Sequence, residues 1–132
     1  MLESIPKDAY IEIYDYPMEM GLEELDRDDD AFGKVARNIL SLGIDRVHFE
    51  NRPGGYPKYL PDISKDRPVC LGGAWGEQCV MKRYEAYGEA GFADVRVVPE
   101  LTVYEAEQKE FERLTAIKIQ QKLESLLVRV RR

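Results

Sequence analysis

The chain has 132 residues, enough for one hydrophobic core. Hydrophobic residues make up 44% of it and charged residues 33%, and no apolar run approaches the roughly 20 residues of a membrane span. The formal net charge is −6, which argues against non-specific binding of nucleic acid. We therefore expect a globular protein that binds neither membranes nor nucleic acid.

The cysteine and histidine counts bear on compartment and on metal binding. The first residues, MLESIPKD, lack the basic and apolar regions of a secretory signal, so we expect none. Two cysteines in such a chain favour free thiols in a reducing cytoplasm. A single histidine argues against a histidine-based metal site, and we expect neither a metal nor a cofactor.

The first predicted strand is Tyr10–Tyr16, in which Ile11 and Ile13 share one face. The alternation with polar residues is typical of a strand whose other face is partly exposed. Asp15 lies at the C-terminal end of this strand. An acidic, irregular loop, with room for a helical turn, is expected over residues 18–30.

The end of that loop is strongly acidic. Asp28, Asp29 and Asp30 are predicted to cap the next helix and to complement its dipole. A carboxylate cation site is the alternative. The helix itself is predicted from apolar residues at helical spacing, namely Phe32, Val35, Ala36, Ile39 and Leu40. Gly43 is expected to end this helix.

A second strand is predicted over Arg46–Asn51. His48 in this strand is either a catalytic base or, more simply, a structural side chain. Residues 52–68 hold too many prolines for a central strand and are expected to form a long connection.

The stretch 67–102 has the pattern of a strand, a glycine turn, a helix, a glycine stop and a strand. The apolar run Val69–Leu71 predicts a strand buried on both faces. Three glycines, Gly72, Gly73 and Gly76, are expected to turn the backbone sharply. The helix is expected to begin near Glu77 and to end at Gly91, before a strand over Asp94–Val98.

Cys79 falls in the first turn of that helix, just beyond a strand. Open α/β sheets bind ligands at that edge, and the positive end of the helix dipole favours a thiolate. The alternative is that Cys79 is a small buried hydrophobic residue.

The C-terminal part of the chain is predicted to be a long helix. Thr102 and Glu105 have the spacing of a capping box, and no Gly or Pro interrupts the residues from Val103 onward. Five apolar residues follow one another at alternating intervals of three and four residues, the pattern of a coiled-coil seam: Ala116, Ile119, Leu123, Leu126 and Val130. The simpler interpretation of this seam is packing on the protein's own sheet, because two heptads are short for a coiled coil. A helix of about 28 residues is roughly 42 Å long, however, which is more than a domain of this size can cover, and the excess length indicates a partner, most simply a homodimer through this helix.

Together these elements predict a single α/β domain over residues 1–132, in which 103–132 form the long C-terminal helix. The order β-α-β, loop, β-α-β, α predicts a small parallel sheet of about four strands flanked by helices, doubly wound and Rossmann-like.

The central stretch resembles the isochorismatase-like cysteine hydrolases, the superfamily that includes nicotinamidases. Their nucleophile segment is an apolar strand, a glycine, then a Thr and an acidic residue before Cys-Val, and here residues 69–80 read VCLGGAWGEQCV. The segment from Gly91 to Thr102 also follows the order of the family, with about one inserted residue. The resemblance covers residues 69–102, about a quarter of the chain; Gly76 replaces the Thr before the nucleophile.

This resemblance implies a hydrolase acting on a small amide or related carbonyl compound. Cys79 would be the nucleophile, Asp15 the proton acceptor, and Lys58 the cation near the thiol, with Lys65 as the second candidate. Backbone amides would bind the ligand and its oxyanion, at Gly73, Ala74, Trp75, Gly76 and Glu77. Two alternatives stay open: a non-catalytic homologue that binds a small ligand on its glycine-rich segment, and a homodimeric interaction module.

Overall fold

The computed structural model describes residues 2–25, 30–50 and 60–131. Within these ranges four parallel strands form one sheet in the order β2-β1-β3-β4. The strands are β1 (Tyr10–Tyr14), β2 (Val47–Glu50), β3 (Val69–Ala74) and β4 (Val95–Val103). The helices are α1 (Met18–Glu23), α2 (Ala31–Leu42), α3 (Met81–Glu89) and α4 (Glu105–Arg131), with short helical turns η1 (Leu2–Ser4), η2 (Ile44–Arg46) and η4 (Gly76–Val80).

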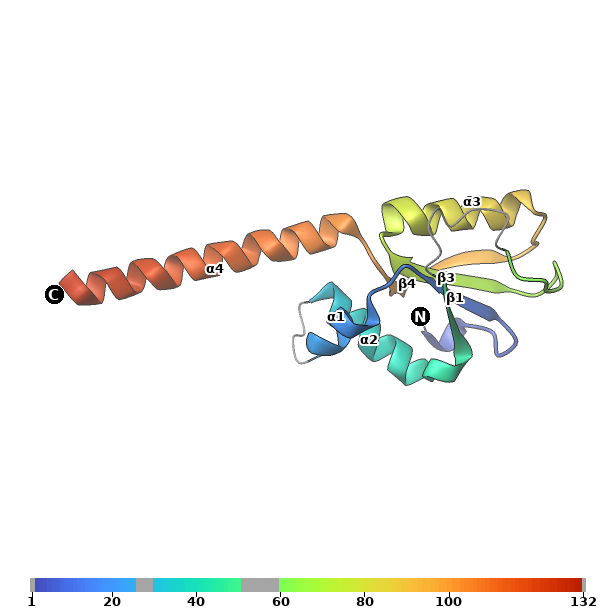
Figure 1. The fold of residues 1–132 in the computed structure, drawn as a ribbon, viewed down its shortest axis with the longest axis horizontal. Coiled ribbons are helices and arrows are strands. Elements are labelled where there is room, and N and C mark those ends of the chain that lie inside the picture. The colour runs from blue at the N-terminus through green and yellow to red at the C-terminus, as the bar shows by residue number, and fades with distance from the viewer. Residues whose placement is uncertain (1, 26–29, 51–59, 132) are drawn as a thin grey trace.

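Helices cover both faces of the sheet, as Figure 1 shows with α1 and α2 below it and α3 above it. Side chains alternate between two clusters of buried residues. Cys70 of β3 joins the cluster against α2, whereas Val69 and Leu71 join the cluster against α3. The predicted fold class, a doubly wound parallel sheet with a long C-terminal helix, is therefore confirmed.

Strand β1 is central, and this changes what its second face does. The predicted strand extended to Tyr16, but β1 ends at Tyr14, and both of its faces are buried. The expectation of a partly exposed face was wrong because α3 covers the side on which Glu12 lies.

The glycines after Leu71 lie in strand β3 and do not form the predicted turn. A Cβ on Gly72 would lie 2.4 Å from the carbonyl oxygen of Leu101, and one on Gly73 would lie 2.0 Å from that of Tyr14. Gly73 also has a φ of 125°, a conformation that other residues rarely adopt. These glycines allow β3 to pack closely between β1 and β4.

Strand β4 is longer than the predicted Asp94–Val98 and contains a bulge. Val97 pairs with Leu71 and Thr102 with Gly73, so extra residues of β4 loop out between these two pairs. The hydroxyl of Thr102 donates to the carbonyl oxygen of Val98 at 2.7 Å, across the bulge. This bond keeps Thr102 in the strand.

Both ends of α2 and the C-terminal end of α3 follow the sequence prediction, whereas α3 begins at Met81 and not near Glu77. The Asp30 carboxylate accepts hydrogen bonds from the amides of Phe32 and Gly33 and so caps α2; Asp28 and Asp29 lie outside the described residues. Gly43 has a φ of 99° after α2, and Gly91 has a φ of 94° after α3.

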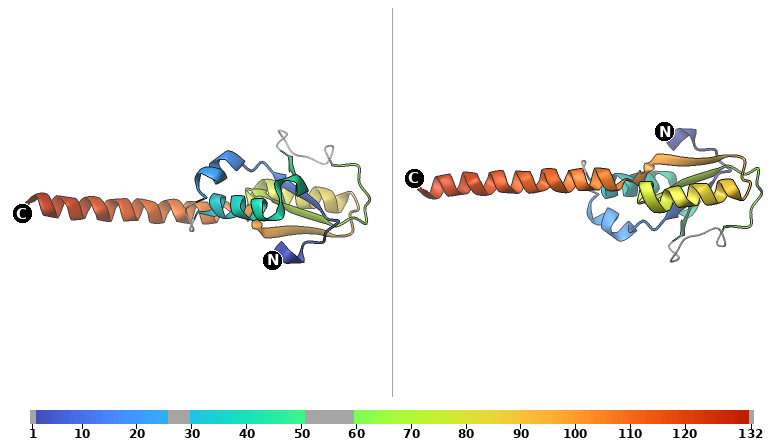
Figure 2. Two further views of the ribbon diagram at one scale, coloured as in Figure 1. Left: turned by 90° about the horizontal axis from the view of Figure 1, so that it is seen from below. Right: turned by 90° about the horizontal axis from the view of Figure 1, so that it is seen from above.

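The predicted capping box at α4 is wrong. Thr102 belongs to β4, and the amides of Glu105 and Ala106 instead donate to the carboxylate of Glu77, at 2.8 and 3.1 Å. Helix α4 begins at Glu105, two residues later than predicted. Figures 1 and 2 show that it extends away from the sheet and the other helices in every view.

Candidate functional site

The candidate site lies at the edge of the sheet where β1 and β3 end. These strands are neighbours, and Tyr14 at the end of β1 pairs with Gly73 of β3. The chain leaves β1 toward one face of the sheet and leaves β3 toward the other. Crevices form at such a point in doubly wound sheets, because the two connections diverge. Asp15 follows β1, and the segment that carries Cys79 follows β3.

Asp15 is held by its backbone in an exposed position. Its φ of 48° is in the left-handed region, which Asp tolerates better than most residues. Its amide donates to the carbonyl oxygen of Glu50 at 2.7 Å, which ties it to the end of β2. The carboxylate is solvent-exposed at the edge of the sheet.

The segment before Cys79 packs closely against its neighbours. Ala74 is buried and the Ala74–Trp75 peptide bond is cis. The half-buried Trp75 ring contacts the Phe32 ring edge-on, with the ring centres 5.8 Å apart. A Cβ on Gly76 would lie 2.5 Å from the ring of Tyr104. Close packing therefore accounts for this glycine as well as for Gly72 and Gly73.

Cys79 sits in η4, which is a wide turn and not the first turn of a regular α-helix. The Trp75 carbonyl accepts from the amides of Gln78 and Val80, the second bond being of the i to i+5 type. Cys79 is partly exposed, whereas Cys70 is fully buried, and both thiols are free. Burial raises the pKa of the Cys70 thiol, as expected for a cysteine inside an apolar strand.

Tyr14 is the last residue of β1 and directly precedes Asp15. Burial raises the pKa of the Tyr14 hydroxyl. The negative charge of Cys79, and to a smaller extent that of Asp15, raises this pKa further, whereas the positive charge of Arg83 lowers it. Cys79 and Asp15 are therefore both near enough to Tyr14 to influence its ionisation. The structure thus brings the predicted nucleophile and the predicted acid–base residue to the same edge.

The predicted lysine is not part of this arrangement. Lys58 lies outside the described residues. Lys65, the second candidate, lies at the opposite edge of the sheet, where its carbonyl accepts from the amide of Ala93 and its ammonium lies 4.3 Å from the centre of the Phe92 ring. The prediction that Lys65 could complete the site is wrong, because residues just before β3 and β4 lie at the amino ends of these strands.

Two further predicted residues have structural partners. Glu77 was expected to bind ligand through its amide; its carboxylate caps α4. The carboxylate accepts backbone hydrogen bonds, and these lower its pKa although desolvation opposes them. His48 stacks on Tyr10, with ring centres 4.4 Å apart and an angle of 8° between the rings, which favours the structural role over that of a catalytic base.

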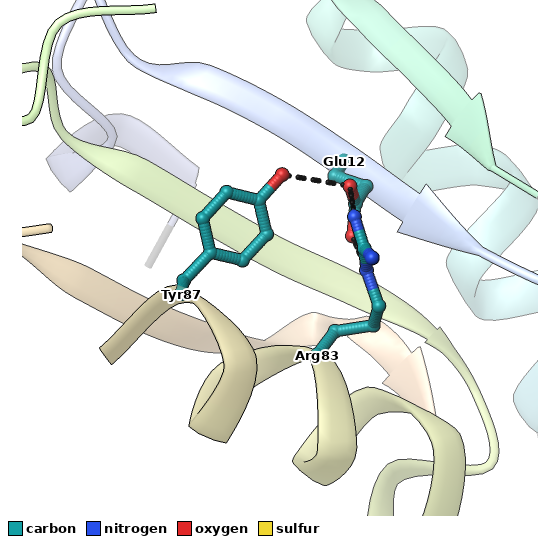
Figure 3. Close-up of polar contacts among 3 residues, drawn as sticks. All are labelled: Glu12, Arg83 and Tyr87. Carbon is teal, nitrogen blue, oxygen red and sulfur yellow. Dashed lines mark hydrogen bonds and ion pairs between the residues drawn. The ribbon is translucent and has the colours of Figure 1, made fainter. Parts of the chain in front are cut away.

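A buried ion pair between α3 and β1 was not predicted from the sequence. Arg83 donates to both carboxylate oxygens of Glu12, at 2.8 and 2.5 Å, and the Tyr87 hydroxyl donates to Glu12 at 2.8 Å. Figure 3 shows Arg83 and Tyr87 reaching from α3 to Glu12 on β1. Burial raises the pKa of Tyr87, and the Glu12 charge raises it further. The available signal was a glutamate in an apolar strand and two long polar side chains four residues apart on one helix face.

Two cavities lie away from this edge. One of about 330 Å³ lies against the C-terminal half of α3, near Tyr84, Gly88 and Phe92. The other, of about 90 Å³, lies beside Cys70 and Arg96. Neither is lined by Asp15 or Cys79, so we place the candidate site at the end of β1 and β3 on chemistry and topology.

Comparison of the chain with protein-family models, with curated proteins and with solved structures finds no match. Among residues 2–25, 30–50 and 60–131, no helix combines the length and apolar character that crossing a membrane requires. The same residues contain no group of three His, Cys, Asp or Glu side chains placed to hold a metal ion.

Proposed function

We propose that the chain is a cysteine-nucleophile hydrolase of the isochorismatase-like kind, acting on a small amide or related carbonyl compound. The observation that carries the proposal is the placement of Asp15 and Cys79 after two adjacent parallel strands, both near Tyr14. The resemblance over residues 69–102 supports the same assignment. Both cysteines are free, which suits a cytoplasmic protein.

In the proposed reaction the Cys79 thiolate attacks the carbonyl carbon of the substrate. Asp15 takes the thiol proton and transfers it to the leaving amine, and water then hydrolyses the thioester to release the acid. Amides of the segment from Trp75 to Cys79 stabilise the oxyanion of the tetrahedral intermediate. The cation that would lower the thiol pKa in this scheme is Lys58.

Comparison of the two thiols in one molecule tests the proposal. Iodoacetamide at pH 7 should label Cys79 much faster than Cys70, and faster than a free thiol, with mass spectrometry locating the label. Asp15→Asn should change the pH dependence of Cys79 labelling, because a neighbouring carboxylate is removed. Asp45→Asn, at an exposed acid of η2, is the control and should leave that dependence unchanged.

The opposite result assigns a different role. A Cys79 that reacts no faster than a free thiol, with no effect of Asp15→Asn, would make the chain a non-catalytic member of this class. If Cys79 is labelled rapidly but no amide is turned over, the thiol is reactive and the missing part of the site is the cation near it.

A second function is favoured by α4. Its described side chains from Ala106 onward are exposed, and several of them are large and apolar: Leu114, Ile117, Ile119, Leu123, Leu126 and Leu127. We propose that α4 pairs with the α4 of a second copy along the seam of Ala116, Ile119, Leu123, Leu126 and Val130. Such a pair would remove exposed leucine and isoleucine side chains from water.

Leu123→Glu tests this pairing. The change places a charge in the proposed apolar contact and should convert the dimer to a monomer at tens of micromolar, measured by light scattering. Gln121→Glu introduces the same side chain on the opposite side of the helix and should leave the dimer intact. A wild-type monomer at that concentration would exclude the pairing.

A further inference from the structure

The Cys79 segment and the first turn of α4 are joined by side-chain contacts. The Glu77 carboxylate accepts the amides of both Glu105 and Ala106. The Gln78 side-chain amide donates to the Glu105 carboxylate at 2.8 Å. Glu77 and Gln78 immediately precede Cys79, so the cap of α4 belongs to the same five-residue turn as the proposed nucleophile.

Packing reinforces this junction. Gly76 lies so close to Tyr104 and Thr102 that a Cβ would come within 2.5 Å of the Tyr104 ring and 2.7 Å of the Thr102 methyl group. Tyr104 directly precedes α4, and Thr102 lies at the end of β4. A displacement of the start of α4 therefore acts on the backbone of the turn that carries Cys79.

The remainder of α4 has little that would hold it against the domain. Its described side chains from Ala106 to Leu127 are exposed, and hydrogen bonds such as those of Arg113 to Glu110 join residues of the same helix. The helix extends about 40 Å for its 27 residues. A partner that binds this length of helix can change its direction at one junction, the cap at Glu77.

We propose that Glu77 is a positioning residue that couples α4 to the Cys79 turn, so that pairing of α4 with a second copy alters the reactivity of Cys79. This inference rests on the proposed function and adds its regulation. The Glu77 carboxylate acts through its two hydrogen bonds to α4, whereas only the backbone amide of this residue belongs to the segment proposed to bind the oxyanion. The cap holds the turn in its packed form, and its release opens the turn and increases access to the thiol.

The test measures the rate at which iodoacetamide labels Cys79 in the full chain at pH 7. Glu77→Ala removes the acceptor from the turn. Glu105→Pro removes one donor from α4 and leaves the Glu77 charge in place, and proline is well tolerated at the first position of a helix. Each change should raise the labelling rate about threefold or more, the lower end of what loss of a hydrogen bond produces. The double variant should be no faster than Glu77→Ala alone, because Glu77→Ala already removes both hydrogen bonds of the cap.

Three controls separate coupling from other effects. Glu107→Ala changes another exposed acid in the first turn of α4 and should not alter the rate. Glu105→Ala keeps the amide donor and should have a smaller effect than Glu105→Pro. Labelling of the buried Cys70 should stay slow in every variant, and Glu77→Gln provides a milder change if Glu77→Ala does not fold.

The outcomes distinguish this inference from the proposed function. Unchanged Cys79 rates in Glu77→Ala and Glu105→Pro would overturn the coupling, even if wild-type Cys79 reacts fast. An equal rise in Cys70 labelling would also overturn it, because the variants would then loosen the whole domain. A slow wild-type Cys79 would refute the catalytic assignment, while the ratios between variants would still measure the coupling.

Discussion

Replacement of Arg83 by methionine tests the buried ion pair most directly. Arg83 and Glu12 are 1% and 2% exposed, so removal of the guanidinium leaves a carboxylate in the interior without its cation. Loss of one partner of a buried pair costs about 3–5 kcal/mol. The Tyr87 hydroxyl remains as a donor to Glu12, but it carries no positive charge. Since domains of this kind have about 5–15 kcal/mol of stability, the variant should lose about a fifth of it or more.

An exposed pair in the same chain provides the matched control. Arg96 also forms two hydrogen bonds with a carboxylate, that of Asp94, but these side chains are 46% and 37% exposed. Arg96→Met should have little effect on the stability because water screens the pair. The two variants remove the same side chain from the same kind of contact and differ in burial.

Urea unfolding followed by the fluorescence of Trp75, the single tryptophan, measures both variants. At about 4 °C per kcal/mol for a domain of this size, Arg83→Met should also lower the melting temperature by roughly 12–20 °C. The double variant Glu12→Leu with Arg83→Met should recover most of the loss, because no charge stays buried. If Arg83→Met and Arg96→Met prove equally mild, the carboxylate of Glu12 is not confined to a dry interior and the reasoning fails.

Three more predictions concern backbone and ionisation. Gly91→Val should lower the stability by more than about 1 kcal/mol, because Gly91 has a φ of 94°. Gly88→Val is the control, at a helical glycine with open space around it. Equal thermal melts of the two variants would count against backbone strain at position 91. Gly73→Ala should prevent folding or cost several kcal/mol, because its Cβ would lie 2.0 Å from the Tyr14 carbonyl oxygen; a wild-type melt would refute this close approach. Burial raises the pKa of Tyr10, Tyr16 and Tyr87 in the folded protein. As the pH rises, the unfolded chain therefore loses the protons of these hydroxyls before the folded protein does. The free energy of unfolding should accordingly be constant below about pH 10 and should fall at higher pH. Equal urea midpoints at pH 9 and pH 11 would contradict this expectation.

The elements with a clear period could be predicted from the sequence. Helix α2 follows from the spacing of Phe32, Val35 and Ile39, and its ends follow from Asp30 and Gly43, because all these signals are local. The parallel sheet follows from the alternation of short apolar runs with helices. The placement of Asp15 and Cys79 at one edge follows in turn, since the carboxyl ends of parallel strands share an edge.

The glycines and the cap of α4 could not be predicted from local pattern. A glycine in a turn and a glycine under a neighbouring backbone look the same in a sequence, because both positions only require that a Cβ be absent. Gly72 and Gly73 are of the second kind. Likewise, the carboxylate that caps α4 comes from Glu77, 28 residues before Glu105, so the nearer Thr102 was the wrong choice.

The energetics of α4 bear on the proposed pairing of this helix with a second copy. A helix in a globular protein obtains most of its stability from packing of an apolar face, but the described side chains of α4 from Ala106 onward are exposed. The local contacts are the cap from Glu77, worth about 1 kcal/mol, and solvent-exposed ion pairs such as Glu105 with Lys109 and Glu110 with Arg113, which contribute little because water screens them. Charged residues are also distributed unevenly along the sequence. Residues 113–132 hold six Lys or Arg and one Glu, whereas residues 1–112 hold 13 basic and 24 acidic residues. A second α4 would supply the missing apolar contact for Ile119, Leu123 and Leu126, and the seam places these three side chains where such a contact would bury them.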